Sequence, residues 1–216
     1  VALRTLNPGL DVLAPVRDNS WVRDQQLAYL QQHNLPLPAQ GSAYSINRGL
    51  WGITIGGQET LTSEGSIPES AWVLSANAFA EPKEPTRHTL TFEQGIPVAL
   101  DGQTLPPVAL IETLEKLAGE YAIGSGIHLG DTVLGTKGRV AFEAPAAITL
   151  ITAHRELEKL VLSAHQARLK DSVAAVYGDM VHYGQQLDLA CDDIEALLPG
   201  HFDPDTINPA PPTTLA

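Results

Sequence analysis

The stretch from residue 87 to residue 121 narrows the possible folds more than any other part of the sequence. Residues 87–92 and 96–100 are two short runs on either side of the turn sequence EQG, which is typical of an antiparallel hairpin or meander. Directly afterwards, PPVALIETLEKLAGEY predicts a helix with prolines in its first turn and Gly119 at its end. Any fold proposed for this chain must therefore join a tight β-hairpin directly to an amphipathic helix.

The sequence after this helix predicts one more β or loop region and then helices. Residues 126–145 carry glycines with β-branched residues between them, which favours strand or loop. Apolar residues then recur at helical spacing over residues 145–170, and a second helical pattern follows over residues 172–184. Apolar helical faces of this kind pack within a domain or against another subunit.

The first 86 residues are less regular. We expect a short buried strand over residues 10–17, and a helix over residues 19–34 that begins at the N-cap Ser20. Strand, loop and helix in this order are typical of an α/β unit, and here they suggest the end of one. Residues 35–86 are rich in proline, glycine and serine, so we expect an irregular segment of the kind that is often functional.

Length and composition indicate an ordinary globular chain. With 216 residues, of which 44% are hydrophobic, one large domain is favoured over two small ones. We expect this domain to cover residues 1–198 and a proline-rich tail to cover residues 199–216. The first residue, Val1, is compatible with a removed methionine or with a cut in a longer chain.

The charge excludes several kinds of partner. A net charge of −12 argues against nucleic acid and against an anionic membrane surface, because both need clustered lysine and arginine. No apolar run approaches the roughly 20 residues that span a bilayer, and the first residues lack the apolar core of a signal peptide. We therefore expect a cytoplasmic protein. The single cysteine, Cys191, has acidic neighbours that disfavour a reactive thiolate.

Common catalytic, cofactor and metal motifs are not found in the sequence. GSGIHLG, residues 124–130, resembles a dinucleotide fingerprint, but its spacing differs and it follows a predicted helix instead of a strand. No phosphate-binding G-x-x-x-x-G-K-[ST] and no G-x-S-x-G occurs, and no histidine pair has the H-x-x-x-H spacing of a helical metal site. We predict no catalytic, cofactor-binding or metal-ligating residues in this chain.

The segment GTKGRVAFEAP offers a candidate binding face. If it is a strand, Lys137, Arg139 and Glu143 point to the same side, because side chains alternate along a strand. Two cations and one carboxylate on one face could hold a zwitterionic ligand. The alternative is a solvated face whose charges pair with each other, which is common and stabilises little.

Several segments in order along the chain resemble one family, argininosuccinate synthase, in its C-terminal part. They include LNPGLDVLAPVR, HNLPLP, YSINRGLWG, FEQGIPVALDGQTLPPVALIETLEKLAGEYAIG, LGTKGRVAFEAPAA and AHRELEKLVL. The resemblance implies an α+β fold of the type of that C-terminal domain, with packed helices on a mixed or antiparallel sheet. It also implies that residues 1–34 include the join to a nucleotide-binding domain that this sequence does not contain.

The resemblance also implies a citrulline-binding role for particular residues. Ser45 and Thr54 stand at the positions of two family hydroxyls that bind citrulline, and they flank a glycine-relaxed turn. Lys137 and Arg139 would organise the same pocket. Two positions depart from the family: Gly130 replaces a citrulline-binding Glu, and Phe142 replaces a binding Tyr. Losing one partner of a buried polar contact typically costs about 1–3 kcal/mol.

Three functions follow from this resemblance. The first is the citrulline-binding part of an enzyme of arginine biosynthesis, which ligates citrulline and aspartate with ATP. It would work only with a nucleotide-binding domain that supplies the sites for ATP and Mg²⁺, either in the same chain or as a separate subunit. The second is an inactive relative that keeps the fold and acts in assembly, as in a homo-oligomer. The third is a rebuilt pocket for a less polar amino-acid or ureido ligand.

Overall fold

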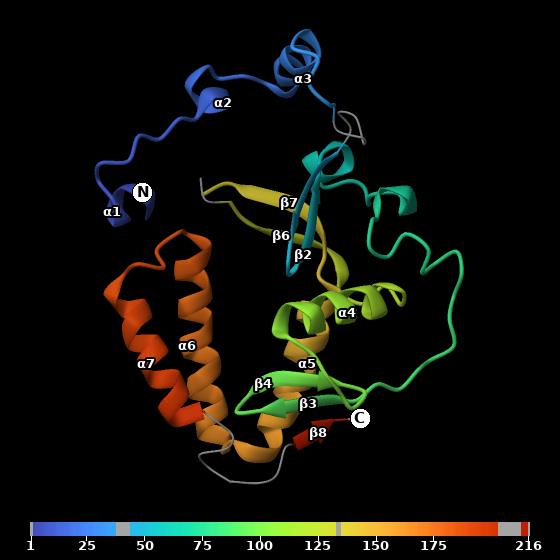
Figure 1. The fold of residues 1–216 in the computed structure, drawn as a ribbon, viewed down its shortest axis with the longest axis vertical. Coiled ribbons are helices and arrows are strands. Elements are labelled where there is room, and N and C mark those ends of the chain that lie inside the picture. Colours follow the sequence, from blue (N-terminus) through green and yellow to red (C-terminus); the bar gives the residue numbers. More distant parts are fainter. Residues whose placement is uncertain (1, 38–43, 133–134, 203–212, 216) are drawn as a thin grey trace.

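The computed structural model describes residues 2–37, 44–132, 135–202 and 213–215. It contains two four-stranded antiparallel sheets and a set of helices, with the helices of the second half lying beside and between the sheets (Figure 1). The α+β fold expected from the sequence is confirmed. In the described residues no helix is long and apolar enough to cross a membrane.

The first sheet brings two distant hairpins together. Strands β1 (Ser45–Gly49) and β2 (Gly52–Gly56) form one hairpin, and β6 (Ser125–Asp131) and β7 (Lys137–Glu143) form the other. The strand order is β1-β2-β7-β6, so β2 and β7 join the hairpins across about 90 residues of sequence. Residues 45–56, expected to be irregular, are thus a regular hairpin, because pairing with β7 supplies hydrogen bonds that no local pattern announces.

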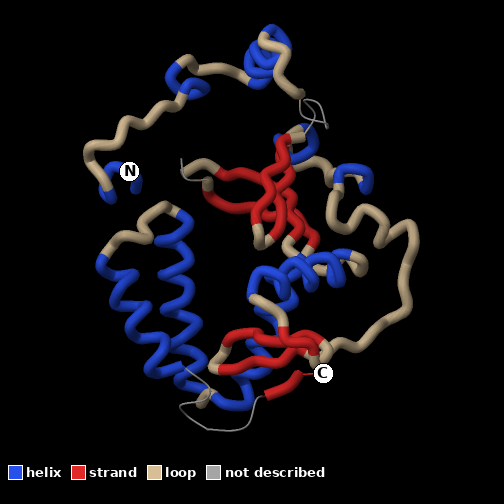
Figure 2. Tube along the Cα trace, in the orientation of Figure 1, coloured by secondary structure: helices blue, strands red, loops and turns tan. Residues whose placement is uncertain are grey.

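The second sheet confirms the hairpin predicted from the sequence. Its strands are β3 (Leu90–Glu93), β4 (Ile96–Leu100), β5 (Gln103–Thr104) and β8 (Thr213–Leu215), in the order β5-β4-β3-β8. Gln94 and Gly95 form the turn between β3 and β4, both with positive φ. Figure 2 shows this sheet packed against helices.

Two helices cover the second sheet and complete its core. The helices α4 (Pro107–Gly119) and α5 (Pro145–Val161) both begin with proline, as expected at a first helical turn. Their apolar faces meet each other and the sheet in one cluster of buried side chains. Its members are Leu90, Phe92, Leu100, Leu110, Ile111, Leu114, Ala146, Leu150 and Leu157.

The long helical region expected from residue 145 divides earlier than predicted. α5 ends at Val161, and α6 (Ala164–His182) begins after Ser163. Ser163 and Gln166 form a reciprocal capping box, in which each side chain accepts a hydrogen bond from the other residue's backbone N–H. This local cap, instead of the boundary near residue 171, fixes the break. α7 (Leu189–Phe202) packs beside α6.

The two ends of the chain differ from their predictions. Residues 10–14 form no strand, and the helices α1 (Ala2–Leu6), α2 (Pro15–Asp18) and α3 (Arg23–Gln32) lead into the domain (Figure 1). α3 starts after Val22, because Ser20 has a positive φ and makes no cap. At the other end, α7 continues through the expected start of the tail, and residues 203–212 and 216 of that tail lie outside the described part.

The segment between β2 and β3 is held to the first sheet by two side chains of β7. It contains the short 3₁₀ helices η1 (Gln58–Leu61) and η2 (Glu69–Ala71). The Glu143 carboxylate, fully buried, accepts hydrogen bonds from the N–H groups of Val73 (2.8 Å), Leu74 (3.0 Å) and Ser75 (2.7 Å), and from the Ser75 hydroxyl (2.5 Å). The segment therefore has a fixed course over the sheet although it is largely irregular.

Arg139 fastens an earlier part of the same segment. Its guanidinium donates hydrogen bonds to the carbonyl oxygens of Gly65 (2.6 Å), Thr62 and Glu59. Between these anchors, Ile67 and Ala71 pack on the inner side of the sheet against Ile53, Ile55 and Ala141.

We predict that Glu143→Gln lowers the free energy of unfolding by about 3 kcal/mol, since an amide NH₂ would replace an acceptor oxygen against buried N–H donors. Thermal or denaturant unfolding measures the loss, and Glu64→Gln, on the exposed part of the same segment, is the matched control. Equal stability of the two variants would show that the carboxylate does not anchor residues 73–75.

Gly52, the first residue of β2, allows a close approach of two backbones. Its φ is +125°, and a Cβ there would stand 2.1 Å from the Glu143 carbonyl oxygen. We predict that Gly52→Ala destabilises the protein by about 2 kcal/mol or more, through strain and steric overlap. Gly49→Ala, in the same hairpin with open space around its Cβ, is the control and should change the melting temperature little. A similar loss in both variants would contradict this reason.

Candidate functional site

The outer face of the first sheet, meaning the side away from Ile53, Ile55 and Ala141, brings together the residues singled out from the sequence. The register pairs Asn47 with Thr54, Thr54 with Phe142, and Phe142 with Gly126, so these four residues form one row across all four strands. Paired residues project to the same side of a sheet. Ser45, two residues before Asn47, therefore projects to this side as well.

The hairpin of β1 and β2 presents two hydroxyl groups on this outer face. Both Ser45 and Thr54 are exposed. A shallow cavity of about 440 Å³ lies beside the hairpin, and Asn47, Thr54 and Phe142 are among the residues that line it. The tip of the hairpin is fixed from the other side, because Arg48 forms an ion pair with Glu115 of α4 (3.1 Å). The hydroxyls are thus held by a braced hairpin, and not by the loop expected from the sequence.

The two positions that depart from the family pattern also lie on the outer face. The ring of Phe142 lies over Gly126, where a Cβ would come within 3.3 Å of it. Gly130 lies on the edge strand β6 opposite Gly138. A Cβ at Gly130 would stand 2.4 Å from Nε2 of His128, so the imidazole covers this glycine. The sequence prediction overlooked His128, although a histidine two residues before a glycine in a strand was visible.

Lys137 and Arg139 lie on the opposite, inner side of the sheet. Residue alternation along β7 confirms that Lys137, Arg139 and Glu143 share one face, as the sequence predicted. That face is not the one with Ser45 and Thr54. Lys137 pairs with Asp131 (2.5 Å) at the sheet edge, while Arg139 and Glu143 bind backbone groups. Contact of Lys137 or Arg139 with a ligand stays a prediction, and in this structure both have other partners.

Tyr44, next to Ser45, forms a hydrogen bond on the inner side. Its hydroxyl donates to Glu59 at 2.6 Å, which ties the start of β1 to η1. This hydrogen bond raises the pKa of Tyr44 and lowers the pKa of Glu59, because it favours the neutral phenol and the ionised carboxylate together. The pair therefore helps to hold the first residue of the candidate site in place.

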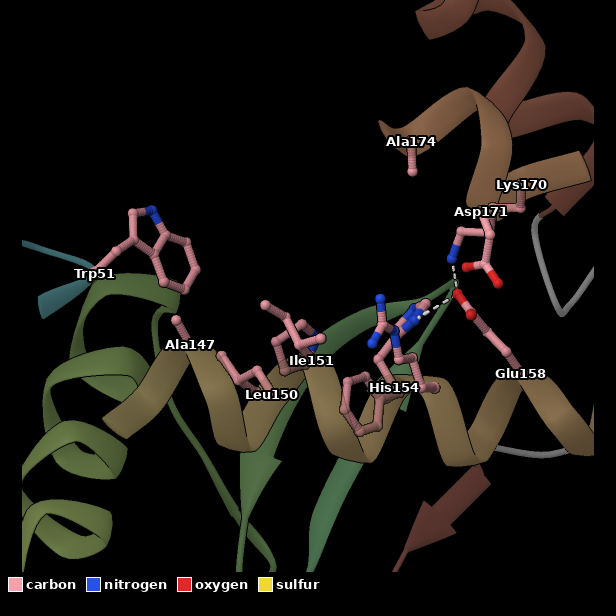
Figure 3. Close-up of a pocket in the computed structure, with 12 residues that line it drawn as sticks. Trp51, Ala147, Leu150, Ile151, His154, Glu158, Lys170, Asp171 and Ala174 are labelled. Atoms are coloured by element: carbon pink, nitrogen blue, oxygen red, sulfur yellow. Dashed lines mark ion pairs between the residues drawn. The ribbon is translucent and has the colours of Figure 1, made fainter. Parts of the chain in front are cut away.

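A second, apolar groove of about 560 Å³ lies between α5, α6 and the turn of the first hairpin (Figure 3). Trp51, Leu150 and Ile151 form part of its wall, and its far end holds an ionic cluster. There Glu158 contacts both Nδ1 of His154 (2.8 Å) and the Lys170 ammonium. Burial lowers the pKa of Lys170. The sequence signal for this cluster is the spacing of four between His154 and Glu158 on one helix.

Other polar groups serve the framework. His88 bonds to Asp101 (2.8 Å) beside the β4–β5 turn, and this contact lowers the pKa of Asp101. Cys191 is buried. Burial is the main cause that raises its pKa, and nearby acidic residues raise it further, in the direction predicted from its acidic neighbours in the sequence. Among the described residues no three histidine, cysteine or acidic side chains are grouped so that they could hold a metal ion.

Comparison with known proteins points to one family. The family model described as "Arginosuccinate synthase C-terminal domain" matches residues 44–201. The chain is similar to argininosuccinate synthases from Methanocaldococcus jannaschii (33% identity over 91% of this chain), Geobacillus kaustophilus (37% over 85%) and Dictyoglomus turgidum (36% over 92%). These matches cover 49%, 46% and 49% of the relatives, so the chain spans about half the length of the curated relatives it matches.

We predict that Tyr44→Phe destabilises the protein most between about pH 4.5 and pH 10, the ordinary pKa values of the two groups. The lowered pKa of Glu59 gives stability that is lost as the pH falls through its folded value. The raised pKa of Tyr44 gives stability that is lost as the pH rises through its own. Melting temperatures at pH 3 and pH 7 test this, with the exposed Tyr29→Phe as control. A pH-independent difference would contradict it.

Proposed function

Because this chain belongs to the argininosuccinate synthase family, as a C-terminal domain of it, we propose that its outer sheet face binds citrulline for ATP-dependent ligation with aspartate. In arginine biosynthesis this ligation joins the ureido carbon of citrulline to the amine of aspartate. The chain would supply the surface that holds the ureido substrate. The domain would act together with a nucleotide-binding domain, in one longer chain or as a separate subunit.

One observation carries this proposal. Ser45 and Thr54 lie nine residues apart in the sequence, but the hairpin places both hydroxyls on one exposed face, with Phe142 next to Thr54 in the sheet. A hydroxyl both donates and accepts a hydrogen bond, which suits a ureido group that carries N–H donors and a carbonyl acceptor. The nearby Asn47 amide has the same dual capacity.

The reaction also needs groups that we assign to the other domain. The sequence has no glycine-rich phosphate loop of the nucleotide-binding type, and the described residues contain no cluster for a metal ion. We therefore propose that ATP and Mg²⁺ bind outside this chain. The role of this chain is to bind and orient the ureido substrate, since holding reactants in position contributes much of the acceleration in such reactions.

A second candidate function has its own support. Gly130 and Phe142 lack the carboxylate and the phenol that the resemblance implies at a citrulline site, which favours an inactive relative that serves in assembly. The helices α5 and α6 expose large apolar side chains, among them Ile151, Leu169 and Val176, which would suit contact with another copy of the chain. A homo-oligomer and a cytoplasmic location stay predictions.

A binding measurement tests the proposed function. We expect L-citrulline to bind the chain saturably in calorimetry, and Ser45→Ala and Thr54→Val each to weaken binding about tenfold, the effect of one lost hydrogen bond. Both positions are exposed, so neither change should lower the melting temperature. Ser70→Ala, an exposed hydroxyl on the segment between the sheets, is the matched control. Absence of binding, or unchanged binding in both site variants, would favour the assembly function.

A further inference from the structure

We propose that His128 recognises the carboxylate of the ligand, and that the site therefore selects ureido acids without requiring their α-ammonium group. This inference rests on the proposed function, because it concerns the same outer sheet face. It goes further by naming the group that carries charge there and the chemical class of ligand that this group admits. The class comprises ω-ureido carboxylic acids, with or without an amino group.

The position of His128 is the first observation. It pairs with Val140 of β7, so it projects to the same side as Phe142 and Thr54. The side chain is exposed, and its ring lies over Gly130, with Nε2 2.4 Å and Cδ2 3.2 Å from the place of a Cβ there. Any side chain at residue 130 would displace the imidazole. The absence of a side chain at Gly130 therefore has a second effect besides removing the carboxylate: it leaves space for the His128 ring.

The composition of the outer face is the second observation. Strand alternation and the register place twelve residues on this side of the four strands, and His128 is the only ionisable one among them. The twelve are Ser45, Asn47, Gly49, Gly52, Thr54, Gly56, Gly126, His128, Gly130, Gly138, Val140 and Phe142. The charged residues of β6 and β7 belong to the other side and have partners there. Asp131 pairs with Lys137, and Arg139 and Glu143 bind backbone groups.

The charge of a suitable ligand follows from this composition. An α-ammonium group would find no carboxylate on the outer face of these strands, whereas a carboxylate finds an imidazole. Histidine is the side chain whose charge ordinarily changes between pH 5 and pH 8. A protonated imidazole attracts a carboxylate, so affinity should rise as the pH falls through this range, while the carboxylate of the ligand stays ionised.

The spacing suits the proposed class of ligand. Thr54 on β2 and His128 on β6 are separated by the single strand β7, about 10 Å across the sheet, and by two residues, about 7 Å, along the strands, so their backbones are about 12 Å apart. An extended five-carbon ureido acid is of comparable length, so its ureido group can meet the hydroxyls while its carboxylate meets the imidazole. The ring of Phe142 lies between them over Gly126 and offers an apolar surface to the methylene chain.

The experiment compares two ligands that differ only in the ammonium group, L-citrulline and 5-ureidopentanoic acid, by calorimetry at pH 6 and pH 8. We expect the compound without the amino group to bind at least as tightly as citrulline. We also expect its affinity to rise about threefold from pH 8 to pH 6, the worth of one exposed charge contact. His128→Gln should abolish the pH dependence.

A second variant guards against an indirect effect of the first. Gly130→Ala leaves the histidine in the sequence but displaces its ring, so it should weaken 5-ureidopentanoic acid as His128→Gln does. Gly178→Ala, on α6 with open space around its Cβ and away from the outer face, should leave binding unchanged. Circular dichroism and melting temperatures verify that all variants fold.

The outcomes separate this inference from the proposed function. If both compounds bind through Ser45 and Thr54 but His128→Gln changes neither affinity nor pH dependence, the inference is overturned and the proposed function stands. If citrulline binds more than tenfold tighter than 5-ureidopentanoic acid, the site does recognise the α-ammonium group of the ligand, and the inference is also overturned. If neither compound binds, the proposed function and the inference fail together.

Discussion

The buried carboxylate of Glu143 is the contact on which the arrangement of the first sheet depends. A buried carboxylate is tolerated only when hydrogen bonds or charges satisfy it, and here three backbone N–H groups and one hydroxyl do so. Those donors belong to residues 73–75, about 70 positions away in the sequence. One side chain thus fixes a long irregular segment against the sheet, and this segment covers the inner side of β7.

Because side chains alternate along β7, this strand contributes to both the inner and the outer face of the first sheet. Arg139, Ala141 and Glu143 point inward, where they hold the segment between the sheets, while Val140 and Phe142 point to the outer face. The same strand pairs with β2 and β6, and so sets the register of the hydroxyl-bearing hairpin relative to His128. A firmly anchored inner face allows the outer face to keep a pre-formed arrangement of small polar groups, which lowers the entropic cost of binding a ligand.

How far the sequence predicted the structure depended on the range of the interactions. The β3–β4 hairpin and α4 were predicted closely, because their signals lie within a few residues. The alternation of Lys137, Arg139 and Glu143 was predicted as well. The partners of Arg139 and Glu143 were not, because backbone groups of residues 59–75 leave no mark in the sequence. The β1–β2 hairpin was missed for a related reason, since its pairing with β7 is long-range.

For the candidate site, the resemblance supplied the residues and the structure supplied their relation to one another. The structure has Ser45, Thr54, Gly130 and Phe142 on one face of the sheet. Lys137 and Arg139 lie on the other face. The structure also brought His128 into the site through its contact with Gly130. The capping box of Ser163 and Gln166 was overlooked in the sequence, because helical periodicity continues on both sides of it.

The most direct test of this account is a map of backbone amide chemical shifts during titration with L-citrulline. If the outer face is the binding site, the shifts should change along residues 45–47, at Thr54 and along residues 126–130 and 140–142. The amides that face Glu143, residues 73–75, should change little. Changes concentrated in α5 and α6 around the apolar groove, with none on the outer face, would contradict the account.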